Sequence, residues 1–127
     1  MFEQDYIMRQ IHQILKVLVK VLFNIDSETI TSALIRDTET KETADYLLKE
    51  IDRGNINEAE NNLSCLTENK TLNSLLTGIV FYSHLNEKDD DYLENNDFSR
   101  DEVEDGIKNL LSEYGLDDMA DIFFDDL

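Results

Sequence analysis

The chain has 127 residues, no proline and only four glycines. This excludes turn-rich β-sandwiches and barrels, which need a turn signal about every 8–12 residues. Its 29 acidic and 11 basic side chains give a net charge of −18, so we expect no nucleic acid and no membrane as a partner. We expect a single helical domain over residues 1–127.

The clearest predicted helix covers residues 3–24. Apolar side chains recur every three to four residues from Ile7 to Leu22, which is typical of a helix with one buried face. Because this apolar face is wide, we expect the helix either to lie at the centre of the core or to form a homodimer with a second subunit. Its polar side is a narrow stripe of Arg9, Gln13, Lys16 and Lys20.

The next segments predict shorter helices. Residues 25–38 are ambiguous, because threonines, which are poor helix formers, interrupt apolar residues at helical spacing. We predict one short helix near 27–36. Helices over 40–53 and 56–67 follow, and Gly54 ends the first of them because glycine accepts the left-handed conformation. A joint this short predicts that the two helices are antiparallel neighbours.

A further helix is predicted over 71–86. Gly78 inside it should cost about 1 kcal/mol relative to alanine, which favours close approach of another helix at this point. His84 and Thr77 are placed on its polar side. Its main face carries Leu72, Leu75, Leu76, Ile79 and Tyr82.

The C-terminal third is acidic. Residues 87–98 predict an ordered loop with one helical turn. Ser99 and Glu102 have the spacing of a capping box, at the start of a helix over 100–114 that Gly115 ends. A last short helix is predicted over 117–124. Residues 87–127 contain 16 acidic and 3 basic side chains, a net charge of −13.

The segment from Gly54 to Ala59 resembles the turn in the middle of a tetratricopeptide repeat. In that repeat the glycine permits the chain reversal, and the small alanine lets two antiparallel helices approach. No proline closes the unit, and there is no second copy at the period of about 34 residues. The resemblance implies one tetratricopeptide-like antiparallel hairpin within an all-α bundle of about six helices.

Three segments are similar to a family of small acidic bacterial proteins of uncharacterised function. They are residues 1–9, residues 57–63, and the helix start at 98–102 together with Tyr114-Gly115 at its end. The resemblance covers nearly the whole chain. It implies a compact helical fold with repeat-like hairpins, and it implies no activity.

No pattern in the sequence predicts a catalytic residue, a cofactor or a metal site. His12 and His84 have no cysteine or HExxH-type spacing near them, and Cys65 is expected to be a partly buried apolar residue. The acid run from Asp89 to Asp97 lacks the spacing of a calcium loop. We therefore expect no enzyme. The solitary cysteine, the acidic N-terminal residues and the shortness of the longest apolar run favour a cytoplasmic protein.

Two features are candidates for partner binding. The stripe of Arg9, Lys16 and Lys20 is either the solvent face of a core helix or a docking strip for an acidic partner or a second copy. The C-terminal tail either packs on its own domain or offers Phe124 and Leu127 to a partner.

We therefore predict a non-enzymatic protein-interaction or adaptor module with an unknown protein partner. The alternative is an acidic inhibitor that imitates nucleic acid, in which the charge of residues 87–127 occupies a basic site on another protein.

Overall fold

The computed structural model describes residues 2–124, and every regular element in that range is helical. The all-α prediction is confirmed. A single turn of 3-10 helix, η1 (Ser32–Leu34), lies between the first two α-helices. The α-helices are α1 (Phe2–Phe23), α2 (Thr38–Asp52), α3 (Ile56–Thr67), α4 (Leu72–Asn86), α5 (Asp90–Asn95), α6 (Arg100–Glu113) and α7 (Asp117–Phe124).

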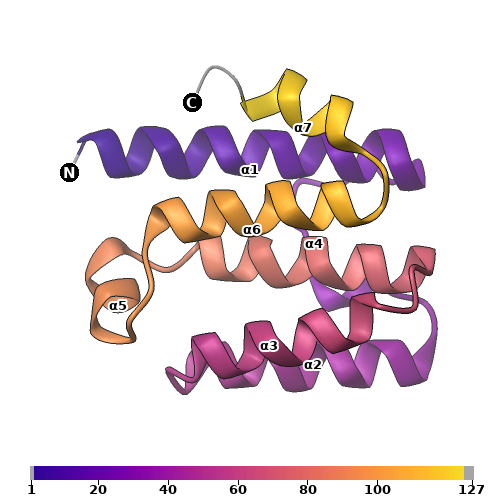
Figure 1. The fold of residues 1–127 in the computed structure, drawn as a ribbon, viewed down its shortest axis with the longest axis horizontal. Helices are drawn as coiled ribbons and strands as arrows, with labels where there is room; N and C mark the ends of the chain where they lie inside the picture. The colour runs from indigo at the N-terminus through magenta and orange to yellow at the C-terminus, as the bar shows by residue number, and fades with distance from the viewer. Residues whose placement is uncertain (1, 125–127) are drawn as a thin grey trace.

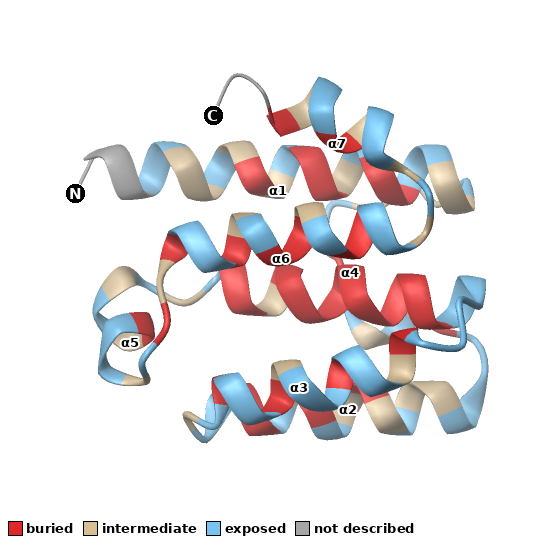
Figure 2. Ribbon diagram, in the orientation of Figure 1, coloured by how far each residue is buried: buried red, intermediate tan, exposed pale blue. Residues whose placement is uncertain are grey.

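The helices form an irregular bundle around α4 (Figure 1). α4 packs on α1, α2, α3 and α6, and α7 packs on α6. Twelve of the fifteen residues of α4 are buried, and Figure 2 shows this helix as the most continuously buried element. The central position that one interpretation gave to the first helix therefore belongs to α4, whereas α1 keeps Tyr6, Val17 and Val21 exposed.

Two sequence predictions for residues of α4 are wrong, because this helix is buried on most of its surface. Thr77 was placed on a polar side but is 1% exposed, and its hydroxyl donates a hydrogen bond to the Asn73 carbonyl. Leu72 was placed on the main face but is 67% exposed, at the first residue of the helix. A helix with four neighbours has no single inward face, so periodicity alone cannot order its positions.

The predicted helix near 27–36 is wrong. In this range only Ser32–Leu34 is helical, as one 3-10 turn, and the Thr31 hydroxyl accepts a hydrogen bond from the Ala33 amide. Threonine side chains that bond to the backbone in this way compete with helix formation. Ile30 and Ile35 are nevertheless buried, so the segment packs on the core without being a helix.

The predicted glycine stops are confirmed, since Gly54 and Gly115 have φ values of +88° and +73°. The predicted capping box is confirmed in part. The Ser99 hydroxyl accepts from the Glu102 amide, but the reciprocal box lies at the start of α4, between Thr71 and Ser74.

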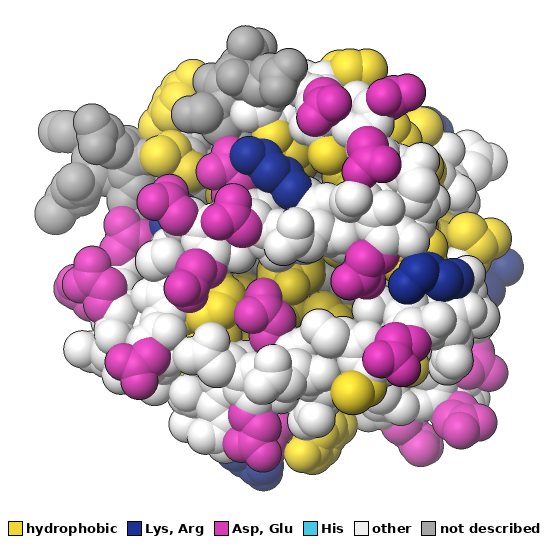
Figure 3. Space-filling model, viewed as in Figure 1, with side chains coloured by type: hydrophobic (Ala, Val, Ile, Leu, Met, Phe, Trp, Pro, Cys, Tyr) yellow, Lys and Arg dark blue, Asp and Glu magenta, His cyan; other side chains and the backbone are white. Residues whose placement is uncertain are grey.

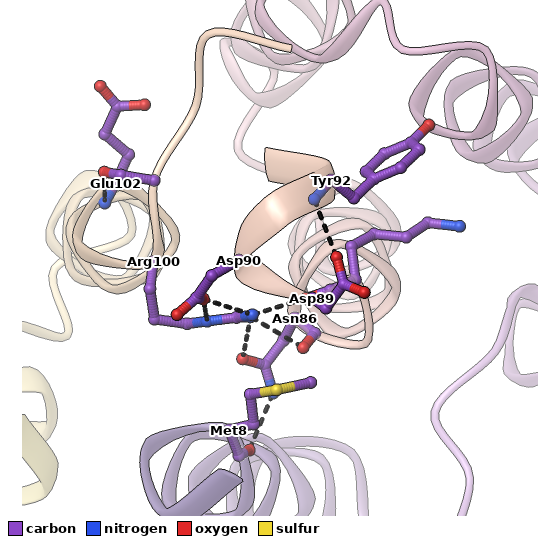
Figure 4. A network of polar contacts seen from close by, with 9 residues as sticks. Met8, Asn86, Asp89, Asp90, Tyr92, Arg100 and Glu102 are labelled. Atoms are coloured by element: carbon purple, nitrogen blue, oxygen red, sulfur yellow. Dashed lines mark hydrogen bonds and ion pairs between the residues drawn. The ribbon is translucent and has the colours of Figure 1, made fainter. Parts of the chain in front are cut away.

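A buried arginine fixes the acidic segment around α5 (Figure 4). The Arg100 guanidinium donates to the backbone carbonyls of Asn86 and Lys88, and it forms an ion pair with Asp90 at 3.0 Å. The Asn86 side-chain amide donates in turn to the Met8 carbonyl of α1 at 2.9 Å. One side chain therefore joins the start of α6 to the end of α4 and the start of α5, and through Asn86 to α1.

α4 and α6 approach closely at two glycines. A β-carbon on Gly78 would lie 2.7 Å from Leu110 Cδ2, and one on Gly106 would lie 2.4 Å from Tyr82 Cε1. Side chains do not pack at such distances. The close approach predicted at Gly78 is confirmed, and the second contact places the Tyr82 ring directly beneath α6.

Candidate functional site

A groove lies between α3 and α6 on the face shown in Figure 3, where apolar side chains are visible at its floor and acidic ones at its edges. Tyr82 of α4, Leu63 of α3 and Leu110 of α6 all line a hollow of about 210 Å³. A second hollow continues it and shares Glu60, Gly106 and Asn109 with the first. The two hollows therefore form one groove.

The two walls of the groove are polar stripes of the flanking helices. α3 turns Ile56, Ala59 and Leu63 toward the core, so its adjacent polar stripe faces α6. That stripe consists of Asn57, Glu60, Asn61, Ser64 and Thr67. The facing stripe of α6 consists of Glu102, Gly106, Asn109 and Glu113, whose spacing of four, three and four residues keeps them on one helix face.

The groove carries uncompensated negative charge. Glu60, Glu102, Asp105 and Glu113 line it, and among the residues that the structure describes no lysine, arginine or histidine does. The Tyr82 hydroxyl donates to Glu60 Oε2 at 2.8 Å, and the Thr67 hydroxyl donates to Glu113 Oε2 at 3.1 Å. These hydrogen bonds come from neutral groups, so the groove has a half-buried carboxylate at its centre and no cation to balance it.

The pKa values of Glu60 and Tyr82 show that burial without a cation disfavours the ionised form of each group. Burial raises the pKa of Glu60 above its ordinary value, and the nearby Glu102 carboxylate raises it further, against the opposing hydrogen bond from Tyr82. Burial also raises the pKa of the Tyr82 hydroxyl, which therefore remains a hydrogen-bond donor. A cation placed beside Glu60 would favour its ionised form.

Replacing Glu60→Gln should leave the protein at least as stable as the wild type at neutral pH. A raised folded-state pKa stabilises the fold below the ordinary pKa of 4.5, and this contribution is lost as the pH rises through the raised pKa. The advantage of the variant should therefore disappear in acid. Urea unfolding at neutral pH and below pH 4.5 measures this, with Glu42→Gln on the exposed side of α2 as control. A variant that loses the same stability at both pH values would contradict the assignment.

The residues predicted from the sequence to bind a partner lie elsewhere. Arg9 and Lys20 are exposed on α1, and Lys16 forms an ion pair with Glu28. Phe124 is 3% exposed with the Lys108 ammonium over its ring, so its ring packs on its own domain. Leu127 lies outside the described residues. Arg9, Lys16, Lys20 and Phe124 do not line the groove.

The residues considered for chemistry do not come together. His84 Nε2 lies 2.8 Å from Asp52 Oδ1, which also binds the Lys88 ammonium. Cys65 was expected to be partly buried but is exposed on α3. Among the described residues, no group of three or more histidine, cysteine or acidic side chains is arranged to hold a metal ion.

Within residues 2–124, no helix has the length and apolar character needed to cross a membrane.

Comparison with known proteins gives one match. A family model described as a family of unknown function, DUF6483, matches residues 1–115. No curated protein and no solved structure matches the chain. The matched range contains every residue that lines the groove.

Proposed function

The chain belongs to this family of unknown function, DUF6483, and we propose that it is a non-enzymatic protein-interaction module. Its groove between α3 and α6 binds a basic amphipathic segment of a partner protein. The observation that carries the proposal is the combination of an acidic rim, an apolar floor and no basic residue in the lining.

The charge of the groove supports a basic occupant. A half-buried carboxylate without a cation lowers the stability of the free protein, and sites that sacrifice stability in this way are commonly functional. A lysine or arginine of the partner would offset the negative charge of Glu60, Glu102 and Glu113. Complementary charge of this kind directs partner choice and speeds association.

The floor of the groove supports an amphipathic occupant rather than a purely charged one. Leu63, Leu110 and the ring of Tyr82 lie between the two polar walls, and the α6 wall carries three of the four carboxylates. These residues are 3–5% exposed, so a helix that carries cations beside an apolar ridge would cover a narrow apolar strip while its charges meet the rim. An amphipathic helix in a groove is a common mode of peptide recognition. The α2–α3 hairpin, with its Gly54 turn and fully buried Ala59, is consistent with a tetratricopeptide-like unit, and such repeats provide concave binding surfaces.

The test is a pull-down with three forms of the protein. The groove variant is Glu102→Lys/Glu113→Lys, and the matched control is Glu42→Lys/Glu94→Lys, which makes the same change in charge at exposed positions outside the groove. Wild type and control should retain a specific partner through a Lys/Arg-rich segment of it, and the groove variant should lose that partner. A partner that the groove variant retains, or no enriched partner at all, would refute the proposal.

The acidic mimic of nucleic acid is the second candidate. It is favoured by the number of exposed acidic residues on α6 and α7, which include Asp101, Asp105, Asp117 and Asp118. A mimic should lose its partner at high salt and be displaced by duplex DNA. Binding in the groove should persist at high salt in part, because contacts with the apolar floor are not screened.

A further inference from the structure

We infer that the groove also binds α1 of a second copy of this chain, so that the protein associates head to tail. The inference rests on the proposed function, because it concerns the same groove and identifies one occupant of it. It differs from a symmetric homodimer, in which α1 would meet α1.

The basic stripe of α1 and the stripe of α6 that lines the groove have the same spacing of residues along the helix. In both stripes the first and last residues are eleven positions apart, about 16.5 Å along a helix. Two cations of α1 are thus separated by the same distance as two carboxylates of α6. The α1 stripe is Arg9, Gln13, Lys16 and Lys20, and the α6 stripe is Glu102, Gly106, Asn109 and Glu113.

The terminal cations of the α1 stripe are available. Arg9 and Lys20 are exposed and have no ion pair with any residue in the described part of the chain. On the helix surface the stripe lies beside Tyr6, Val17 and Val21, which are 56%, 40% and 62% exposed. The outward face of α1 is therefore a basic edge next to an apolar ridge, the pattern that the groove fits.

The centre of the contact is also complementary. Gly106 is buried, and the Tyr82 ring occupies the place where its side chain would lie, so the Tyr82 ring forms the middle of the surface that would meet the residues between Arg9 and Lys20. The apolar ridge of α1 would then reach the floor formed by Leu63 and Leu110. Both ends of the stripe would meet a glutamate at the rim.

One copy cannot fill its own groove. α1 is held on its own core by Ile11, Leu15 and Leu18, which are fully buried, and none of the α1 side chains described, from residue 5 to residue 23, lines the groove. The contact must therefore be made by another copy, and a contact between two different surfaces produces an open series or a ring rather than a closed pair. The repulsion between copies of net charge −18 is screened at distances beyond about 8 Å at physiological salt.

The test is sedimentation velocity at physiological ionic strength. The stripe variant is Arg9→Glu/Lys20→Glu, and the groove variant is Glu102→Lys/Glu113→Lys. The wild type should form species that grow with concentration, and each variant alone should be monomeric. An equimolar mixture should associate again, because the reversed charges of one variant match the other. Their net charges change from −18 to −22 and −14, so both remain acidic and general attraction cannot explain the rescue.

The matched controls are Arg36→Glu/Lys49→Glu and Glu42→Lys/Glu94→Lys, at exposed positions outside both surfaces. They should associate as the wild type does, and circular dichroism should show all variants folded. A monomeric wild type together with a mixture that does not associate would overturn the inference. Self-association of the groove variant alone would also overturn it, in favour of an α1–α1 dimer. If only self-association fails while the groove variant still loses its partner in the pull-down, the proposed function stands.

Discussion

Arg100→Met should destabilise the fold by about 3 kcal/mol, because breaking a buried charged network leaves groups without their partners. Methionine replaces the aliphatic part of arginine but lacks the guanidinium and cannot donate hydrogen bonds, so the carbonyls of Asn86 and Lys88 would lose their donor. Urea unfolding measures the loss. Hydrogen exchange should show the largest increase in residues 87–98, which this side chain joins to α4 and α6 (Figure 4).

Arg53→Met is the matched control for that experiment. Arg53 also forms an ion pair with a carboxylate, that of Glu50, but its side chain is 64% exposed. The Glu50 carboxylate is only 10% exposed, but it keeps its hydrogen bond from the Asn55 amide when Arg53 is replaced. Ion pairs of exposed side chains contribute about 0–1 kcal/mol, so this variant should lose much less stability than Arg100→Met. Equal losses for the two variants would show that the Arg100 network has no special role.

Gly106→Ala should destabilise the protein by about 1–2 kcal/mol even though alanine favours helices by about 1 kcal/mol over glycine. The new β-carbon would lie 2.4 Å from Tyr82 Cε1 and 2.6 Å from the Tyr82 hydroxyl. The ring is 5% exposed and is held by Glu60, so it cannot move without opening the groove floor. The same variant should therefore also weaken binding of a partner.

A double mutant separates the clash from other effects. In a Tyr82→Leu background the ring is absent, so Gly106→Ala should become neutral or stabilising through helix propensity alone. The change in sign, measured by urea unfolding, is the specific result. If Gly106→Ala costs the same stability in both backgrounds, the close contact with Tyr82 is not its cause.

Periodicity and turn chemistry predicted most of the helices. α3 was predicted at 56–67 and α7 at 117–124, and both have those bounds. The apolar spacing of each helix and the acidic residues in its first turn predict the same boundaries. The prediction for 27–36 failed because the Ser27 and Thr31 hydroxyls hydrogen-bond to the backbone there, and no local pattern reports that competition. Residues 2–124 contain seven α-helices rather than about six, because the segment predicted as a loop with one turn contains α5.

The groove could not be predicted because its walls are far apart in the sequence. Glu60 of α3 and Glu102 of α6 line the same groove only after α4 has packed beneath both helices. The Tyr82 ring, which donates to Glu60, needs glycine at position 106, because a β-carbon there would lie 2.4 Å from it. A signal was nevertheless present. A second glycine inside a predicted helix, on the same stripe as two glutamates, indicates a close contact next to an acidic surface. Arg100 carried a weaker signal, as one of three basic residues in a strongly acidic segment.

The most direct test of the central claim is an NMR titration of the ¹⁵N-labelled protein. The probe is a synthetic amphipathic helical peptide with lysines at positions i, i+7 and i+11 beside an apolar ridge. The amides of α3 and α6 that line the groove, from Asn57 to Thr67 and from Glu102 to Glu113, should shift, and Glu102→Lys/Glu113→Lys should abolish the shifts. Shifts confined to other surfaces, or shifts that survive in that variant, would contradict a groove that binds basic segments.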